Sequence, residues 1–415
     1  MIVGTIVARN YLAHARVLGR SFADHHPGRR LRVLVVDGEV GEPLDVTDEP
    51  FDVVLPSDLP LDEREFVVMA AIYDATELAT AVKPAFLLRL LEDVDVACYL
   101  DPDVEIFAPL DELEQLASEH GIVLTPHALE PIPDDGLKPT PDDIAAAGVF
   151  NLGFICVSRA ARPFLEWWDA RLRRDCLIDF EQGLFVDQRL LDVIPAYFTH
   201  VVFKDSAYNV AYWNLHERDL AERSGAYQVD GQPLVFFHFS GYNPGLPDVL
   251  SKHGGDRPRI VPADRPAVAA ICERYRGRLL DEGYAWQIVL PYGFAASASG
   301  RPLDRRLRRQ YRDVVLAGGE PPDPFATDDP WAFEAWRQEL GERDEPSPAR
   351  LRAQALLDAG NDVTSRRAWL RPLQAAIGRL LRHHDLHGRQ VDAALLESVI
   401  ELEERVRRLG RRLDA

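Results

Sequence analysis

The strongest constraint on the fold is a series of short, continuously apolar runs in the first hundred residues, with helical stretches between them. The runs occupy residues 2–8, 31–37, 52–55 and 94–100. Patterns typical of helices occupy residues 12–25 and 67–92, the second with a break before Pro84. Continuous apolar runs indicate strands buried on both faces, as in parallel sheets covered by helices. The pattern therefore predicts an α/β fold of the doubly wound, Rossmann-like type, with a mainly parallel sheet and helices on both faces.

The rest of the chain divides near residue 255. Four further strands are expected before that point, at residues 121–125, 151–158, 196–203 and 234–239. A proline- and aspartate-rich loop is expected at 131–141. After residue 255 the strand pattern ends, and a helix is expected at 265–283. We therefore expect a catalytic domain over 1–255 and a mainly helical C-terminal region over 256–415, with a loop or linker near 318–330.

The last predicted helix, residues 391–413, carries apolar residues at alternating spacings of four and three. This is the seam of a short coiled coil, and it would allow a homodimer through the C-terminal helices. An amphipathic helix that packs on its own chain fits the same pattern. We expect the region after 255 either to complete the acceptor side of a site or to mediate self-association.

The net charge of −20 opposes non-specific binding to nucleic acid, which needs a basic surface. An anionic substrate would need local positive charge or a metal ion. The four cysteines form no CxxC pair, and nothing in their spacing indicates an oxidising compartment. There is no recognisable signal peptide and no apolar run near the roughly 20 residues of a membrane span. These features predict a cytoplasmic protein and leave open a peripheral position at a membrane.

Two carboxylates follow the fourth predicted strand directly, in the segment Asp101-Pro102-Asp103. Ligands of open α/β sheets bind outside the carboxyl ends of the strands. Residues i and i+2 of an extended backbone point to the same side, and Pro102 restricts the backbone between them. Two adjacent carboxylates repel each other unless a cation or a proton lies between them. The segment therefore predicts a site for Mn²⁺ or Mg²⁺ against a diphosphate; the alternative is that both residues only cap a turn.

A histidine, His238, lies inside the aromatic run that ends in Ser240-Gly241. Imidazole is a common metal ligand, and two aspartates with one histidine would favour Mn²⁺ over Ca²⁺. The alternative is a core histidine with a satisfied hydrogen bond. Asp37 ends the second predicted strand, where an acidic side chain could accept a ribose hydroxyl, although a turn residue before Gly38 fits equally.

Several segments in order resemble the GT-A fold glycosyltransferases, most closely the family 8-like retaining enzymes, over about residues 1–255. The segments are 5–12, Ala81-Val82-Lys83-Pro84, Tyr99 to Asp103, Phe150-Asn151-Leu152-Gly153-Phe154, Asp187-Gln188, and His238 with Gly241. In that group the first segment holds the nucleoside, the third is the D-x-D metal motif, and the Asp-Gln pair lies near the transferred sugar.

The resemblance implies a retaining transfer from a UDP-sugar to a hydroxyl acceptor. By this resemblance Asp101, Asp103 and His238 bind the metal, and Asp187 and Gln188 contact the donor sugar or the acceptor. The remaining donor contacts would come from Thr5, Ala8, Asn10, Tyr11, Asp37, Lys83, Asn151, Gly241 and Lys252. The acceptor could be a polysaccharide, a lipid-linked glycan, a small metabolite or a protein, and the aromatic and amide residues at 208–214 suit sugar contacts.

One departure concerns the diphosphate. The family usually follows its histidine with a Lys-Pro-Trp contact, whereas this chain has Tyr242-Asn243-Pro244, so Lys252 or Arg257 further along could replace the charge. Two other functions remain. A sugar nucleotidyltransferase would want a glycine-rich basic loop after the first strand, and residues 7–11 contain no glycine. A non-catalytic module that binds sugar or partners would not need the intact Asp101, Asp103, Asp187 and His238.

Overall fold

The computed structural model describes residues 1–180 and 182–343. The chain divides into one compact unit, Met1–Pro330, and a second that begins at Trp331 and contains nearly all of α12 (Pro330–Arg343). Residues 256–330 thus belong to the same compact unit as residues 1–255, and the predicted boundary near 255 stays a prediction about which residues make up a catalytic domain. The predicted helix at 391–413 lies outside the described residues.

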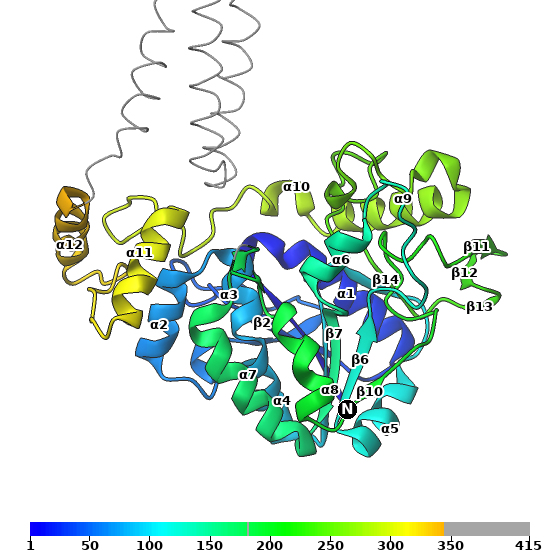
Figure 1. Ribbon diagram of the computed structural model, residues 1–415, viewed down its shortest axis with the longest axis horizontal. Helices are drawn as coiled ribbons and strands as arrows, with labels where there is room; N and C mark the ends of the chain where they lie inside the picture. Colours follow the sequence, from blue (N-terminus) through cyan, green and yellow to red (C-terminus); the bar gives the residue numbers. More distant parts are fainter. Residues whose placement is uncertain (181, 344–415) are drawn as a thin grey trace, which may run out of the picture. The chain divides into compact units, whose positions relative to one another are not determined.

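The centre of the first unit is a seven-stranded sheet with the order β10-β6-β7-β4-β1-β2-β3 (Figure 1). Its strands are β1 (Ile2–Val7), β2 (Leu31–Val35), β3 (Phe51–Val54), β4 (Val96–Leu100), β6 (Ile122–Pro126), β7 (Phe150–Ser158) and β10 (Val201–Val202). Only β7 runs against the others, pairing antiparallel with both β4 and β6. Every residue of β4 and β7 is buried, as expected for strands covered on both faces. The predicted α/β fold with a mainly parallel sheet is confirmed.

Helices cover both faces because successive side chains of a strand point to opposite sides. On one face Val3 and Val7 share a core with α1 (Leu12–His25) and α5 (Asp111–His120). On the other face α4 (Lys83–Asp93) lies so close to β1 that a Cβ at Gly4 would be 2.7 Å from the Phe86 ring. Next to α4 packs α7 (Arg162–Asp175) (Figure 1).

The stretch expected to be helical over 67–92 forms three helices, α2 (Glu63–Ile72), α3 (Ala75–Ala81) and α4. The first break has a local cause: the Asp74 carboxylate accepts from the N–H groups of Thr76 and Glu77 and starts a new helix. Pro84 lies in the first turn of α4, as predicted.

One predicted strand is wrong. Residues 196–203 contain the end of α8 (Ile194–Tyr197), and only the two residues of β10 pair with the sheet. The apolar run there packs through aromatic contacts, since Phe198 lies against Phe164 and Trp167 of α7. Alternation of apolar residues could not separate these two outcomes.

A second, two-stranded sheet lies beside the first at the carboxyl end of β4. There β5 (Val104–Ile106) pairs antiparallel with β14 (Phe236–His238), from the region predicted to be a strand over 234–239. Over this pair lies α9 (Pro266–Asp281), where the Tyr275 ring stacks on Phe239 with centroids 3.7 Å apart. The fully buried Glu105 of β5 pairs with Arg274 and Arg278 of α9 and ties the helix to the strand.

The remaining elements lie at the periphery of the first unit. They are α6 (Pro141–Ala147), the hairpin of β8 (Ile178–Asp179) and β9 (Leu184–Phe185), the three-stranded sheet of β11 (Leu220–Arg223), β12 (Ala226–Val229) and β13 (Gln232–Pro233), α10 (Tyr284–Gln287) and α11 (Arg305–Leu316). All four cysteines are buried free thiols. In the described part of the chain, no helix has the length and apolar character needed to cross a membrane.

Candidate active site

The two aspartates of the Asp-Pro-Asp segment lie in the turn that joins β4 to β5. The N–H of Asp101 donates to the carbonyl of Gly153 in the neighbouring β7 (2.8 Å), and the N–H of Val104 donates to the carbonyl of Asp101 (3.2 Å). The Tyr99 hydroxyl donates to Asp101 Oδ1 at 2.7 Å. Side-chain exposure is 28% for Asp101 and 18% for Asp103, so both carboxylates remain accessible to a ligand.

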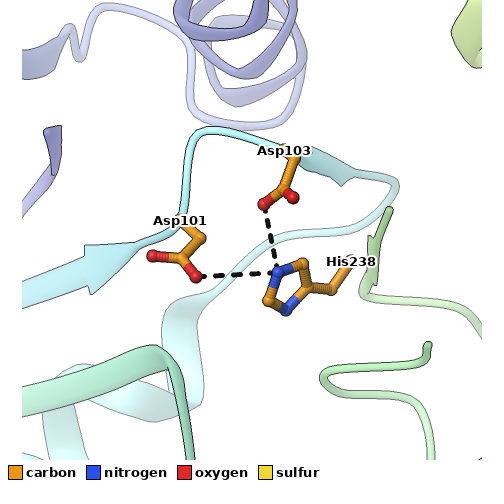
Figure 2. A group of neighbouring side chains, drawn as sticks. All are labelled: Asp101, Asp103 and His238. Atoms are coloured by element: carbon orange, nitrogen blue, oxygen red, sulfur yellow. Dashed lines mark ion pairs between the residues drawn. The ribbon is translucent and has the colours of Figure 1, made fainter. Parts of the chain in front are cut away.

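Strand pairing brings His238 to this turn from 135 residues further along the chain. His238 is opposite Val104 in the β5–β14 pair, and the next N–H, of Phe239, donates to the carbonyl of Asp103 at 2.8 Å. His238 Nε2 lies 3.0 Å from Asp103 Oδ1 and 3.6 Å from Asp101 Oδ2 (Figure 2). The ligand atoms of the three residues all lie within 4.8 Å of one another, and no other such group of three occurs in residues 1–180 and 182–343.

A chain of hydrogen bonds fixes which nitrogen of His238 faces the carboxylates. The Gly153 N–H donates to Asn151 Oδ1 (3.2 Å), so that atom is an acceptor. Asn209 Nδ2 donates to the same oxygen (3.0 Å) and to Thr125 Oγ1 (2.9 Å), which leaves Asn209 Oδ1 to accept from His238 Nδ1 (3.3 Å). With its proton on Nδ1, a neutral His238 directs the lone pair of Nε2 at Asp101 and Asp103.

Three electron-rich groups that face one another repel unless a proton or a cation lies between them. Burial lowers the pKa of His238, but the charge and hydrogen bond of Asp103 outweigh burial, and the net pKa is raised. Burial raises the pKa of Asp103, and its pairing with His238 outweighs this, so the net pKa is lowered. Without a metal, a proton on Nε2 would satisfy the cluster. With two carboxylates and an imidazole, the donor set also suits Mn²⁺.

Gly153 leaves the space that the His238 ring occupies. A Cβ at this position would lie 2.2 Å from His238 Cε1 and 2.6 Å from Nδ1, closer than any atoms can pack. The glycine of the Asn151-Leu152-Gly153 segment therefore allows the ring to lie against β7 with Nε2 toward the aspartates.

Lys83 and Asp187 form an ion pair behind the aspartates. Lys83 Nζ lies 2.5 Å from Asp187 Oδ2, donates to the Leu152 carbonyl (2.9 Å) and sits 4.3 Å from the centre of the Tyr99 ring. Both side chains are almost fully buried, so Lys83, although it begins α4, is not solvated. Burial raises the pKa of Asp187, the charge and hydrogen bond of Lys83 lower it, and the net pKa is raised. Through Tyr99, which also binds Asp101, the pair is linked to the cluster of Asp101, Asp103 and His238.

Gln188 and Asn151 connect the same region. Gln188 Oε1 accepts from the N–H of Leu152 (3.0 Å) and from Asn151 Nδ2 (3.3 Å), and Gln188 Nε2 donates to the carbonyl of Ala147 (2.9 Å). The structure therefore brings five predicted residues, Lys83, Asn151, Asp187, Gln188 and His238, to β7. Their roles toward a donor or acceptor stay predictions.

The predicted nucleoside segment, residues 5–12, runs from the last residues of β1 to the first residue of α1. Thr5 and Ala8 are buried, while Asn10 and Tyr11 are partly exposed. The Tyr11 ring stacks on His14 with centroids 3.8 Å apart, and burial followed by the charge of Asp103 raises its pKa.

Asp37 is fully buried, and its two oxygens accept from the N–H groups of Arg9 (2.8 Å) and Gly293 (2.9 Å). It would have to move to reach a ribose hydroxyl, so the predicted ribose contact stays a prediction. Gly241, with φ +71°, begins a loop that returns at Lys252, whose N–H donates to the carbonyl of Gly241 (3.0 Å). Lys252 is exposed.

Sequence reasoning included Asn209, Gly153 and Tyr99 only as members of longer segments and gave none of them a role of its own. Asn209 was included only as a member of the 208–214 segment considered for acceptor contacts; it is fully buried, with φ +53°, and it supports His238. Trp213 of that segment is also buried and contacts the His238 ring edge-on at 5.1 Å. The signal for Gly153 was its place two residues after Asn151.

No protein-family model matches the chain. Among curated proteins, it is similar to two uncharacterized proteins of Bacillus subtilis strain 168. YfnD is 26% identical over 249 residues, which cover 57% of this chain and 76% of YfnD. YfnF is 30% identical over 184 residues, 41% of this chain, and the match spans only 58% of the length of YfnF.

Solved structures similar to the chain include the galactosyltransferase LgtC in complex with donor and acceptor sugar analogs, at 15% identity and a TM-score of 0.35, over 68% of this chain and 96% of LgtC. The glycosyltransferase GlyE of Streptococcus pneumoniae TIGR4 matches at 12% identity and a TM-score of 0.39, over 70% of this chain and 66% of GlyE. Mouse xyloside xylosyltransferase 1 matches at 12% identity and a TM-score of 0.34, over 57% of this chain and 96% of that chain.

Proposed function

We propose that the chain is a metal-dependent glycosyltransferase that moves a sugar from a UDP-sugar to a hydroxyl acceptor. The observation that carries the proposal is the orientation of His238: the Asn151–Asn209 hydrogen bonds hold its proton on Nδ1, and Nε2 faces Asp101 and Asp103 at 3.6 and 3.0 Å. A metal-binding histidine typically donates its other ring N–H to such an acceptor, which fixes the orientation of the ring.

In the proposal Asp101, Asp103 and His238 hold Mn²⁺ or Mg²⁺, with Mn²⁺ favoured by the nitrogen ligand. Bound there, the ion would act as a Lewis acid that stabilises the negative charge developing on the departing diphosphate. Tyr99 fixes the Asp101 carboxylate by its hydrogen bond and leaves Oδ2 toward the centre of the cluster. The turn between β4 and β5 is held on both sides, by Gly153 and by Phe239, so the two carboxylates keep their separation.

The sugar of the donor would lie along β7, against Asp187 and Gln188. The charge of Asp187 is already balanced by Lys83, so this side of the site is close to neutral and suits a hydroxylated ring rather than a second anion. Asn10 and Tyr11 would contact the nucleoside, and Lys252, on its exposed turn, would approach the diphosphate. Transfer with retention is proposed on the family resemblance alone, and the acceptor class stays open.

The test is release of UDP by the full chain from a panel of UDP-sugars, with Mn²⁺ and with chelator. We expect release with at least one donor, dependent on the metal and lost in Asp103→Asn. Asp95→Asn, whose carboxyl is exposed on the surface, should behave as the wild type. Absence of UDP release from every donor with metal present would contradict the proposal. Formation of UTP from a UDP-sugar and added pyrophosphate would instead favour a nucleotidyltransferase.

A further inference from the structure

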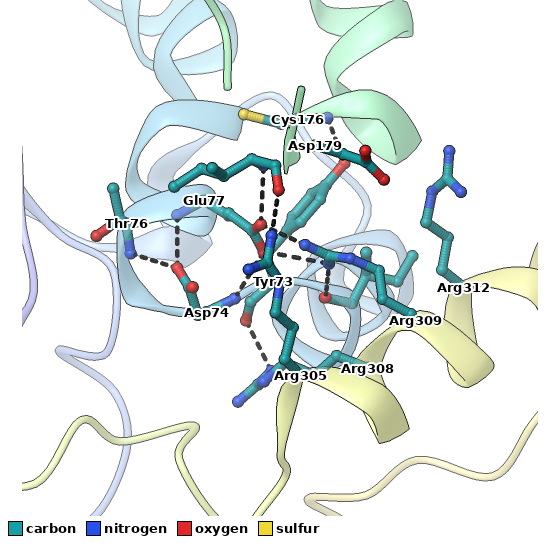
Figure 3. Close-up of polar contacts among 12 residues, drawn as sticks. Tyr73, Asp74, Thr76, Glu77, Cys176, Asp179, Arg305, Arg308, Arg309 and Arg312 are labelled. Atoms are coloured by element: carbon teal, nitrogen blue, oxygen red, sulfur yellow. Dashed lines mark hydrogen bonds and ion pairs between the residues drawn. The ribbon is translucent and has the colours of Figure 1, made fainter. Parts of the chain in front are cut away.

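One face of α11 presents arginines where an amphipathic helix normally presents apolar residues. Arg305, Arg308, Arg309 and Arg312 follow the spacing i, i+3, i+4 and i+7, which places them in one stripe. Arg308 and Arg309 contact the region of Ala70 to Glu77 (Figure 3), Arg305 contacts Ile178, and Arg312 contacts the end of α7. This helix lies beyond residue 255, outside the region that resembles glycosyltransferases.

Arg308 and Arg312 bind the carboxyl ends of two helices. The Arg308 guanidinium, buried with 3% exposure, donates to the carbonyls of Ala70 (2.6 Å) and Tyr73 (2.7 Å) at the end of α2. Arg312 donates to the carbonyl of Arg174 (2.5 Å) and to Asp175 Oδ1 (2.8 Å) at the end of α7. The last carbonyls of a helix have no partner within it, and a cation there also interacts favourably with the helix dipole.

The other two arginines hold the backbone of a single residue, Ile178 in β8. Arg305 donates to the carbonyl of Ile178. Arg309 pairs with the buried carboxylate of Glu77, and Glu77 Oε1 accepts from the N–H of Ile178 at 3.1 Å. Glu77 Oε2 also accepts from the N–H of Asp74 (3.3 Å) at the start of α3. Both backbone hydrogen-bonding groups of Ile178, its carbonyl and its N–H, are thus held by α11, the first directly and the second through Glu77.

Ile178 in turn sets the path of the backbone that leads to Asp187 and Gln188. It pairs with Phe185 in the β8–β9 hairpin, and the neighbouring Leu177 carbonyl accepts from the N–H of Val186 at 2.8 Å. Val186 has φ +41°, a conformation that a β-branched residue adopts only when its surroundings enforce it. Asp187 follows directly and is aimed at Lys83.

We propose that the arginine face of α11 is a positioning element of the transfer site. It holds the backbone carbonyl and N–H of Ile178 and thereby keeps Asp187 and Gln188 against β7. This rests on the proposed function for the roles of Asp187 and Gln188 toward the sugar. Arg305 and Arg309 are positioning residues, since they act through Glu77 and the hairpin and touch neither Asp187 nor Gln188. The region after residue 255 would then contribute to the site indirectly, from a distance of over 100 residues in sequence.

The test compares Arg309→Met, Arg309→Lys and the milder Arg305→Met in the full chain, by hydrogen exchange and steady-state kinetics. In Arg309→Met we expect the amides of Ile178 and Val186 to exchange at least about tenfold faster, while the amides of β1 and β4 are unchanged. We expect kcat to fall about tenfold or more, with a smaller change in the donor KM, because misplacement of side chains affects the reacting geometry first. Arg309→Lys, which keeps a charge for Glu77, should recover part of both losses.

Leu316→Ala is the matched control, because Leu316 is on the same helix and its side chain is exposed. It should change neither the exchange of Ile178 nor kcat. Unchanged exchange of Ile178 and Val186 in folded Arg309→Met and in folded Arg305→Met would overturn the positioning role. A uniform rise in exchange over the whole sheet would also overturn it, because it would indicate general destabilisation. If the wild-type chain transfers no sugar, the proposed function fails, and the exchange measurement still decides whether α11 holds the hairpin.

Discussion

Lys83 and Asp187 lie 104 residues apart in sequence, and their charged groups meet at 2.5 Å in a setting where both side chains are almost fully buried. Removing one member of such a pair leaves an uncompensated charge away from water. We expect Lys83→Met to lower the free energy of unfolding by about 3–5 kcal/mol, measured by urea denaturation. The double variant Lys83→Met/Asp187→Asn should regain part of this loss. A loss in the double variant equal to the sum of the losses in Lys83→Met and Asp187→Asn would show that the two charges are not coupled.

The loss in Lys83→Met should also depend on pH. The pKa of Asp187 is already raised by burial against the opposing effect of Lys83, and without Lys83 it rises further. The folded state then keeps a proton that the unfolded state loses above its ordinary pKa of about 3.9. Stability therefore falls as pH rises from that value to the folded pKa. We expect Lys83→Met to be less destabilised at pH 5 than at pH 8, while the double variant should show no such difference.

Gly153 is expected to be essential to metal binding. In Gly153→Ala the new Cβ would meet His238 Cε1 at 2.2 Å, so the ring must move away from Asp101 and Asp103. We expect Mn²⁺ affinity, measured by calorimetry, to fall at least about tenfold. Gly277→Ala is the control, because a Cβ there meets nothing within 4 Å and position 277 lies in α9, away from β7. Wild-type affinity in Gly153→Ala would show that the position of His238 is not needed for binding.

Asn209 should affect the metal without touching it. Its Oδ1 accepts from His238 Nδ1 at 3.3 Å and so fixes the tautomer with Nε2 free. Removal of such a partner typically lowers metal affinity 10- to 100-fold, as an order of magnitude, and we expect this for Asn209→Ala. Asn243→Ala, a change of an exposed asparagine in the turn at Gly245, should leave the affinity unchanged. An Asn209→Ala variant that binds Mn²⁺ as the wild type does would remove the argument for the tautomer.

Much of the frame of the site could be predicted because it is encoded locally. The apolar run of β4 and the two aspartates after it are adjacent in sequence, and parallel α/β sheets place ligands at that end. His238 could be predicted because the aromatic strand that contains it is recognisable in the sequence. The pairing of that strand with β5 could not be predicted. Helix α1 was predicted with the bounds it has in the structure, from periodicity alone.

What could not be predicted depends on contacts between distant segments. Asn209 acts through partners at positions 125, 151 and 238, and nothing in its own neighbourhood indicates them. The arginine face of α11 was missed because periodicity searches follow apolar residues, and here the buried stripe is cationic. The strand expected at 196–203 failed because aromatic packing on α7 stabilises a short helix instead.

The most direct test of the central claim is pulsed electron paramagnetic resonance of Mn²⁺ bound to the full chain in the presence of UDP. We predict coupling of the manganese to one histidine nitrogen. The coupling should be lost in His238→Gln and retained in His200→Gln, because the His200 ring bonds to the Phe198 carbonyl. Bound Mn²⁺ without nitrogen coupling, or coupling that persists in His238→Gln, would contradict a metal site made of Asp101, Asp103 and His238.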